Sequence, residues 1–223
     1  MAEPRILAVD VGGSHVKVRL SSGGGEDRRF DSGPDLTAQE MADGVKTLTA
    51  DWAFDRVSIG VPTPVRDGRP TREPVNIGSG WVAFDYERAF GVPTRVVNDA
   101  AMQALGSYEG GKMLFLGLGT GLGSTLVVDG VLVPMELGHL PFRKETFEDY
   151  VGARGRERLG KRKWREAVFE TVAALSAALE PDYVVMGGGN AKKLGELPPN
   201  ARLGANDNAF VGGFRLWDDG PRG

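Results

Sequence analysis

Two glycine-rich turns constrain this chain more than any other feature. They read DVGGSHVK at residues 10–17 and LGTGLGS at residues 118–124, and each follows an apolar run of β type. Glycine lets backbone N–H groups approach a phosphate closely, and the hydroxyls of Ser14 and Thr120 add further donors. A single turn of this kind is a weak signal. Two of them indicate a phosphate chain held between two related halves.

The composition narrows the class of protein. The 223 residues are 41% hydrophobic, enough for one large domain or two small ones around a cleft. A net charge of -3 argues against a nucleic-acid partner. The absence of cysteine excludes disulfides and Cys-based metal sites and fits a reducing compartment. With no room for a signal peptide before residue 6 and no membrane-length apolar run, we expect a cytoplasmic protein without a membrane partner.

The predicted elements repeat along the chain. A strand, a glycine turn and a second strand are predicted over residues 6–21 and again over residues 113–128, which indicates an internal duplication in an α/β protein. Residues 37–52 are predicted to be helical, with Thr37 as N-cap and Glu40 at N3. Other predicted helices cover residues 86–90, 100–108, 147–151 and 161–179, and other predicted strands cover residues 57–61, 94–97, 132–134 and 183–186.

Further motifs stand between and after the two turns. They are GVPTPV (60–65), FGVP (90–93) leading to Asn98 and Asp99, ELGH (136–139), EDY (148–150), GGG (187–189) and NAFVG (208–212). In this order and spacing, and over nearly the whole chain, the set resembles the ROK sugar kinases of the actin/hexokinase-like superfamily. The first turn, NIGSGW (76–81) and ELGHL (136–140) look most like the polyphosphate glucokinases of that family.

The resemblance implies a fold and a division into lobes. The fold would be an actin/hexokinase-like (ribonuclease H-like) two-lobed α/β fold with a duplicated βββαβα-type core and a central cleft. Residues 1–98 would form a small lobe, which residues 206–223 could complete, and residues 99–205 a large lobe. Relatives of this kind are usually dimers or tetramers, so a homodimer is expected.

The resemblance also implies a reaction. A phosphoryl group would pass from polyphosphate or ATP to the 6-hydroxyl of glucose, with mannose as a further candidate acceptor. Asp99 would be the general base; from its position between a strand and a helix alone, a helix N-cap is the simpler reading. Asp10 would hold a hydrated Mg²⁺ ion, and the alternative is that it caps a turn.

The remaining site residues divide into two sets. Asn98, Glu136, His139 and Glu148 match the family's sugar-contacting positions, although surface carboxylates and a satisfied histidine are the plainer alternatives. A basic run over residues 154–165 is either a track for a long polyanion or a solvated helix start. The phosphate-binding set is Gly12, Gly13, Ser14, Lys17, Gly119, Thr120 and Gly121.

Three departures from the family pattern keep other functions open. Thr63 replaces a usual glycine, the family's Cys-rich zinc site is missing, and the chain after Gly189 is short. The alternatives are an ATP-dependent ROK kinase for another hexose or an N-acetylhexosamine, and a non-catalytic sugar-binding ROK protein. A sugar-responsive regulator is disfavoured, because the first strand begins near Ile6 and leaves no room for an N-terminal helix-turn-helix.

Overall fold

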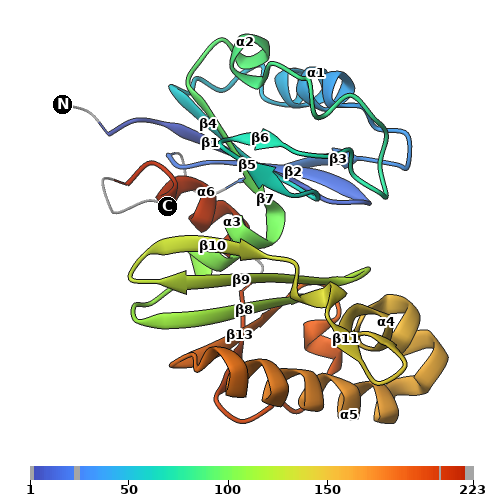
Figure 1. The fold of residues 1–223 in the computed structure, drawn as a ribbon. Coiled ribbons are helices and arrows are strands. Elements are labelled where there is room, and N and C mark those ends of the chain that lie inside the picture. Colours follow the sequence, from blue (N-terminus) through green and yellow to red (C-terminus); the bar gives the residue numbers. More distant parts are fainter. Residues whose placement is uncertain (1–2, 23–25, 206, 219–223) are drawn as a thin grey trace. The chain divides into compact units, whose positions relative to one another are not determined.

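The computed structural model describes residues 3–22, 26–205 and 207–218, and its chain divides into two units (Figure 1). Unit 1 comprises Met1–Gly106 and Asp207–Asp219, and unit 2 comprises Ser107–Asn206 and Gly220–Gly223. Each unit has its own five-stranded mixed sheet. No helix in the described part of the chain is long and apolar enough to cross a membrane.

The sheet of unit 1 has the strand order β3-β2-β1-β4-β7. β1 pairs with β2 in antiparallel fashion, whereas β1, β4 and β7 run parallel. Parallel strands end at the same edge of a sheet, so the residues that end or follow these three strands share one edge. The strands are β1 (Ile6–Val11), β2 (His15–Leu20), β3 (Asp27–Asp31), β4 (Arg56–Val61) and β7 (Thr94–Asn98).

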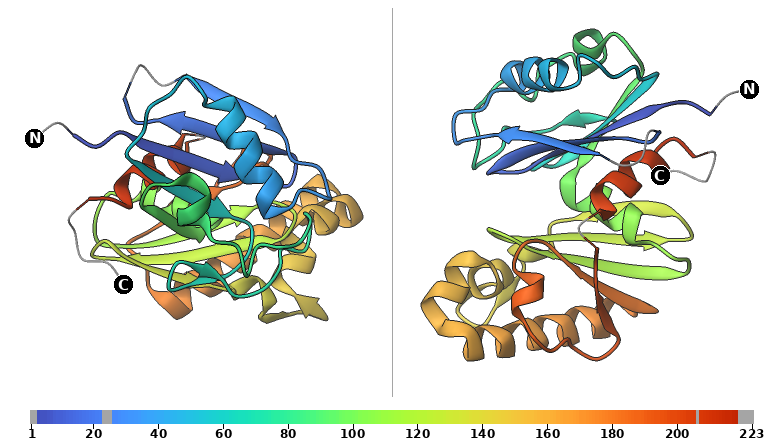
Figure 2. Two further views of the ribbon diagram at one scale, coloured as in Figure 1. Left: turned by 90° about the horizontal axis from the view of Figure 1, so that it is seen from above. Right: turned by 180° about the vertical axis from the view of Figure 1, so that it is seen from behind.

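Helices cover both faces of the unit 1 sheet (Figure 2). Leu7 and Val9 of β1 belong to the core cluster that includes Met41 and Val45 of α1. Ala8 points to the opposite face, where its Cβ lies against Gly213 of α6. This alternation is the two-residue period of a strand with both faces buried. The helices are α1 (Ala38–Leu48), α2 (Tyr86–Phe90), α3 (Asp99–Ser107) and α6 (Asn208–Arg215).

Local sequence signals explain how α1 begins. The Thr37 hydroxyl accepts a hydrogen bond from the Glu40 N–H at 3.2 Å, and the Glu40 carboxylate accepts one from the Thr37 N–H at 2.9 Å. This is the capping box predicted from the sequence, and it satisfies two of the unpaired donors at the start of the helix. The prediction of the cap is therefore confirmed, although α1 ends at Leu48, before residue 52.

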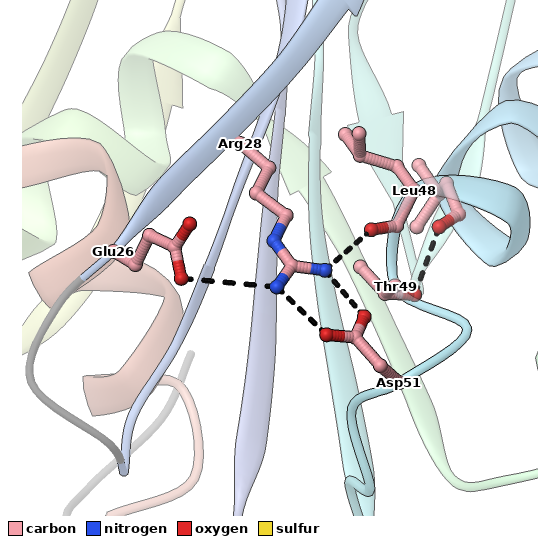
Figure 3. A network of polar contacts seen from close by, with 6 residues as sticks. Glu26, Arg28, Leu48, Thr49 and Asp51 are labelled. Atoms are coloured by element: carbon pink, nitrogen blue, oxygen red, sulfur yellow. Dashed lines mark hydrogen bonds and ion pairs between the residues drawn. The ribbon is translucent and has the colours of Figure 1, made fainter.

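The edge strand β3, which the sequence analysis did not predict, is joined to the end of α1 by one arginine (Figure 3). The Arg28 guanidinium donates to the Leu48 carbonyl at 2.9 Å, pairs with both oxygens of Asp51 and lies 3.7 Å from the Glu26 carboxylate. It also stacks over the Trp52 ring, 4.2 Å from the centroid. These contacts hold β3 in place where its own alternating polar sequence gives little apolar burial.

Unit 2 repeats this plan. Its sheet order is β10-β9-β8-β13-β14, again with three antiparallel strands followed by two parallel ones. The turn at Asp129 and Gly130 joins β9 to β10 with positive φ at both residues, as a DG hairpin signal predicts. The predicted duplication is therefore confirmed. The strands are β8 (Lys112–Leu118), β9 (Leu122–Val128), β10 (Val131–Met135), β13 (Tyr183–Gly187) and β14 (Ala201–Leu203).

One long helical element covers a face of the unit 2 sheet. α5 (Ala153–Leu179) contains Gly160 at φ 71°, a non-helical position where two helical segments join. The second segment therefore starts at the predicted residue, 161. Trp164, Val168 and Val172 are buried on its inner side, as the helical spacing predicts. The other elements are η1 (Leu137–His139), α4 (Phe147–Val151), η2 (Ala191–Lys193) and the short strands β5 (Val65–Arg66), β6 (Arg69–Pro70), β11 (Pro141–Phe142) and β12 (Glu145–Thr146).

The division into units differs from the expected boundary between residues 98 and 99. α3 packs closely on α6: a Cβ at Gly106 would lie 1.8 Å from the Asn208 carbonyl oxygen, and one at Gly212 would lie 1.8 Å from that of Met102. Residues up to Gly106 therefore belong to unit 1. The contact joins segments about a hundred residues apart in sequence, which no local pattern reveals.

Candidate functional site

Asp10 lies at the carboxyl edge of the unit 1 sheet. In register it faces Lys17 on β2 and Gly60 on β4. Burial raises the pKa of the Asp10 carboxyl group above its ordinary value, and the positive charge of Lys17 partly opposes this rise. A bound cation would favour the ionised form of this carboxylate and so offset the cost of its burial.

The first glycine turn is an open segment of unit 1. The Gly12 N–H donates to the His15 carbonyl at 3.0 Å, and the Ser14 carbonyl accepts from the Ser32 N–H at 3.1 Å. Gly13 and Ser14 are exposed, and a Cβ at Gly13 would meet nothing within 4 Å. The turn is thus held at its two ends and accessible in its middle.

Two nitrogen-bearing side chains, those of His15 and Lys17, follow this turn on the same face of β2. The His15 imidazole lies 3.3 Å from the Asp31 carboxylate, across the antiparallel pair of β2 and β3. Lys17 is exposed and is the residue opposite Asp10. Of the two, only Lys17 stands beside the carboxylate at the sheet edge.

Asn98 and Asp99 form the junction between β7 and α3. The Asn98 side-chain oxygen accepts from the N–H groups of Ala100 at 3.0 Å and Ala101 at 3.2 Å, so Asn98 caps the helix. Asp99 is the first helical residue, and its carboxylate accepts from the Ala100 N–H at 2.8 Å. A Cβ at Gly60 would lie 3.3 Å from the Asp99 Cα, so a glycine on β4 permits this close approach.

Thr63, which stands where the family has a glycine, forms hydrogen bonds within the protein's own loops. Its side chain is buried, and its hydroxyl donates to the Arg72 carbonyl at 2.9 Å. Its carbonyl accepts from the Asn98 amide at 3.2 Å. The threonine therefore connects the segment after β4 to the one that precedes α2, and it supports the residue that caps α3.

The second glycine turn, in unit 2, is packed against three neighbouring segments, although Thr120 is exposed and a Cβ at Gly119 would meet nothing within 4 Å. The Ala153 N–H contacts the carbonyls of Gly119 and Thr120, both at 3.1 Å, and the Asn190 amide donates to the Gly119 carbonyl at 3.1 Å. A Cβ at Gly121 would lie 2.4 Å from a Glu148 carboxylate oxygen. The start of α5, the segment after β13 and the second residue of α4 thus all converge on this turn.

Three of the predicted sugar-contacting residues gather in unit 2. The His139 imidazole lies 3.8 Å from the Glu136 carboxylate through Nδ1 and 3.7 Å from the Glu148 carboxylate through Nε2. All three side chains are partly exposed. Carboxylates around an imidazole offer several hydrogen-bond acceptors and donors to a ligand rich in hydroxyls.

The chain around these residues is fixed by Ser124 of β9, which the sequence analysis did not single out. Its hydroxyl donates to the Met135 carbonyl at 2.7 Å and accepts from the Leu137 N–H at 3.0 Å. These two hydrogen bonds fix the backbone on both sides of Glu136, where η1 begins. A serine inside a predicted strand gives no signal of such a role, because its partner lies on a neighbouring strand.

The structure separates the basic run of residues 154–165 into different environments. Arg158 pairs with Glu145, Arg162 with Glu166 and Arg165 with Glu196. For these three, the plainer alternative of a solvated, salt-bridged helix surface is the better account. Arg156 instead donates to the Asn190 side-chain oxygen at 3.4 Å, beside the second glycine turn.

Asn190 is a residue of this site that sequence reasoning missed. It is 8% exposed, and its side-chain oxygen also accepts from the Lys193 ammonium at 2.8 Å. An asparagine directly after three glycines was the available signal. Its partner Gly119 is too distant in sequence for that signal to show the contact.

The carboxylates of the described residues suit one mode of metal binding. No group of three or more His, Cys, Asp or Glu side chains is arranged to hold a metal ion in the part of the chain that the structure describes. Mg²⁺ does not need such a cage, since it is commonly held by one or two carboxylates, substrate phosphates and waters. Asp10, a single carboxylate beside a glycine turn, fits that mode.

Comparison with known proteins finds sugar kinases among the relatives of this chain. No family model matches it. The polyphosphate glucokinase of Mycobacterium tuberculosis is 26% identical over 214 residues, covering 86% of this chain and 80% of that protein. The glucokinase of Pyrobaculum calidifontis is 24% identical over 238 residues, covering 82% of this chain and 79% of that protein.

Solved structures agree with the sequence relatives. The inorganic polyphosphate/ATP-glucomannokinase of Arthrobacter sp. strain KM has a TM-score of 0.81 at 25% identity and covers 96% of this chain and 98% of its own. A ROK-family glucokinase from Streptomyces griseus, solved with glucose and AMPPNP, has a TM-score of 0.72 at 19% identity, with 95% and 98% covered. The fold is that of the ROK-family sugar kinases. Polyphosphate glucokinase is the protein that the chain most resembles among these relatives, as the motifs indicate.

Proposed function

We propose that this chain is a sugar kinase that transfers a phosphoryl group from polyphosphate or ATP to the 6-hydroxyl of glucose. The names of its relatives, a polyphosphate glucokinase and a polyphosphate/ATP-glucomannokinase, support this donor and acceptor and make mannose the next sugar to test. The proposal includes action in the cytoplasm as a homodimer.

The observation that carries the proposal is the different roles of Asn98 and Asp99 at the start of α3. Asn98 accepts from the N–H groups of Ala100 and Ala101 and so supplies the cap of α3, while the Asp99 carboxylate shares the Ala100 N–H. Asp99 then serves as the general base, taking the proton from the sugar hydroxyl as that oxygen bonds to the terminal phosphorus of the donor; the bond from this phosphorus to its bridging oxygen breaks, and ADP or a polyphosphate shortened by one phosphate leaves. A positioned base contributes about 10²- to 10⁴-fold to the rate of such a reaction.

The sugar would be bound mainly through the carboxylates and the imidazole of unit 2. The Glu136 and Glu148 carboxylates can accept hydrogen bonds from neighbouring hydroxyls of a pyranose, and the His139 imidazole can accept or donate one. Asn98, the fourth residue that matches the family's sugar-contacting positions, belongs to unit 1. Gly121 has a specific part in this arrangement, because any side chain there would displace the Glu148 carboxylate.

The two glycine turns would bind the phosphates of the donor. Gly12, Gly13, Ser14 and Lys17 belong to the first turn, and Gly119, Thr120 and Gly121 to the second. Backbone N–H groups and hydroxyls arranged in such turns stabilise the negative charge of phosphate oxygens. Asp10 would hold Mg²⁺, which when bound neutralises part of the charge on the donor phosphates.

The Asp99→Asn variant tests the base directly. We expect kcat to fall by about 10³-fold while the Kd for glucose, measured by calorimetry, stays unchanged. Asp85→Asn is the matched control, because Asp85 is a carboxylate that caps α2 in the same unit, and it should leave kcat unaltered. Near-normal turnover in Asp99→Asn would show that the base lies elsewhere.

A competition between donors tests the rest of the proposal. Glucose, mannose and N-acetylmannosamine are offered with ATP, with polyphosphate, and with both. Phosphorylation of glucose by polyphosphate is the expected result. Exclusive use of ATP would contradict the proposed donor, preference for another sugar would contradict the proposed acceptor, and binding of glucose without turnover would make the chain a sugar-binding protein.

A further inference from the structure

Two cations of unit 2 share one neutral acceptor beside the second glycine turn. The Lys193 ammonium lies 2.8 Å and the Arg156 guanidinium 3.4 Å from the side-chain oxygen of Asn190. Within the described residues, neither cation forms an ion pair with a carboxylate. Two positive charges therefore meet at an amide oxygen that cannot neutralise them.

This arrangement differs from that of the other basic residues of α5. Arg158 and Arg162 each donate to a glutamate at 2.7 Å, which compensates their charge locally. Arg156 is half-buried, and its guanidinium lies 5.9 Å from the centroid of the buried Trp164 ring. A cation held against an apolar surface without a counterion creates a local positive potential that attracts an anion.

The backbone fixes both cations close to the turn. The Asn190 N–H donates to the Leu118 carbonyl at 2.9 Å, and its side-chain amide donates to the Gly119 carbonyl at 3.1 Å. Gly188 packs so tightly that a Cβ would lie 2.5 Å from the Leu118 carbonyl oxygen. The segment that carries Lys193 is therefore pinned against the glycine turn, and Arg156 reaches the same asparagine from α5.

We propose that Arg156 and Lys193 form a binding site for the outer phosphates of a condensed phosphate chain whose terminal group lies at the second glycine turn. The inference rests on the proposed function and names the residues that would recognise an inorganic polyphosphate donor. A phosphate oxyanion replaces the Asn190 amide oxygen as acceptor, because its negative charge adds a Coulombic attraction to both cations that the neutral amide lacks. ATP carries the same phosphate oxyanions, but its chain has only three phosphates.

The test removes each charge while keeping a hydrogen-bonding side chain of similar length. Arg156→Gln, Lys193→Gln and the double variant are compared with Arg162→Gln, whose side chain is 72% exposed and pairs with Glu166. For the double variant we expect the KM for polyphosphate to rise about 30-fold and the KM for ATP about 3-fold, with the KM for glucose unchanged. The slope of log affinity against log salt for polyphosphate should fall by about 1.4, since each lost phosphate contact contributes about 0.7.

A structural role for the two cations predicts a different pattern. If they only hold Asn190, the double variant will melt earlier and lose kcat equally with both donors, and Arg156→Lys will not restore the KM for polyphosphate. That pattern would overturn the proposal, as would a double variant with unaltered donor KM and salt dependence. Restoration of the polyphosphate KM by Arg156→Lys would support it.

Direct binding of tripolyphosphate, measured by calorimetry without sugar, separates this inference from the proposed function. If the wild type binds tripolyphosphate and the double variant does not, the site stands even where no sugar is phosphorylated. If both bind it equally while the wild type phosphorylates glucose, the kinase assignment stands and the two-cation site is wrong. If the wild type does not bind tripolyphosphate, the proposed two-cation site is also wrong.

Discussion

The two glycine turns arise from the same strand–turn–strand plan, yet they differ in how closely other elements pack against them. The first turn has two backbone hydrogen bonds at its ends and an exposed middle, where a Cβ at Gly13 would meet nothing within 4 Å. The second turn packs against α4, α5 and the segment after β13, where Gly121 of the turn and Gly188 of that segment have no room for a side chain, although Thr120 is exposed. The repeat is thus one of topology, and packing differs between the copies.

This difference shows what each turn requires of its glycines. At the second turn Gly121 is needed for packing, because the Glu148 carboxylate occupies the position that a Cβ would take, whereas a Cβ at Gly119 would meet nothing within 4 Å. At the first turn the structure itself gives no packing reason for Gly13, so a ligand that approaches the backbone is the remaining explanation. Substitutions at matched positions can break or sharpen this contrast.

The largest expected effect is that of Gly188→Ala. Gly188 has φ 80°, and the added Cβ would lie 2.5 Å from the Leu118 carbonyl oxygen. Left-handed strain and a backbone clash together should lower the free energy of unfolding by about 3 kcal/mol. That corresponds to a fall in Tm of about 10 °C, measured by calorimetry. Gly189→Ala is the control, since a Cβ there meets nothing within 4 Å, and an equal loss in both variants would contradict the packing argument.

A smaller effect, of opposite sign, is expected for Asp10→Asn in unit 1. Burial raises the pKa of Asp10 above its ordinary value of 3.8, so the folded state binds its proton more tightly than the unfolded state does. The ionised carboxylate therefore costs stability, and this cost grows as the pH rises above 3.8 towards the folded-state pKa. Asp10→Asn should raise Tm at pH 7 and abolish the dependence of the rate on Mg²⁺.

Thermal unfolding of the wild type and of Asp10→Asn between pH 3 and pH 8 checks the sign of this change in Tm. The gain in Tm from Asp10→Asn should shrink as the pH falls and disappear once the carboxyl group is protonated in both states. A loss of Tm at pH 7 would mean that the charge of Asp10 contributes a stabilising interaction with Lys17 that outweighs its burial.

The smallest effect on stability is expected for Gly13→Ala. The open surroundings should keep the free energy of unfolding within about 0.5 kcal/mol of the wild type. If the backbone of this turn approaches the donor, the KM for the donor should nevertheless rise several-fold in steady-state assays. Unchanged stability together with an unchanged donor KM would remove Gly13 from the proposed phosphate-binding set.

Much of the fold was predictable, because its signals are local. The capping box of Thr37 and Glu40, the DG hairpin and the buried helical face around Trp164 each depend on residues close together in sequence. The edge strands β3 and β14 were missed. β3 is polar, β14 is short, and both are defined by pairing with a distant strand rather than by their own pattern.

The sequence by itself determined the duplicated plan, the two turns and the residue types able to handle phosphate and sugar. Only the tertiary structure decided which of two neighbouring residues caps α3, which cations of the basic run are neutralised by glutamates, and that Arg156 and Lys193 meet at Asn190. The physical reason is the range along the chain over which each interaction acts. Propensities and caps act within a few residues, whereas packing and charge pairing depend on distances in space that the order of residues does not state. For the two glycine turns, the same short motif therefore predicts the turn but not its surroundings.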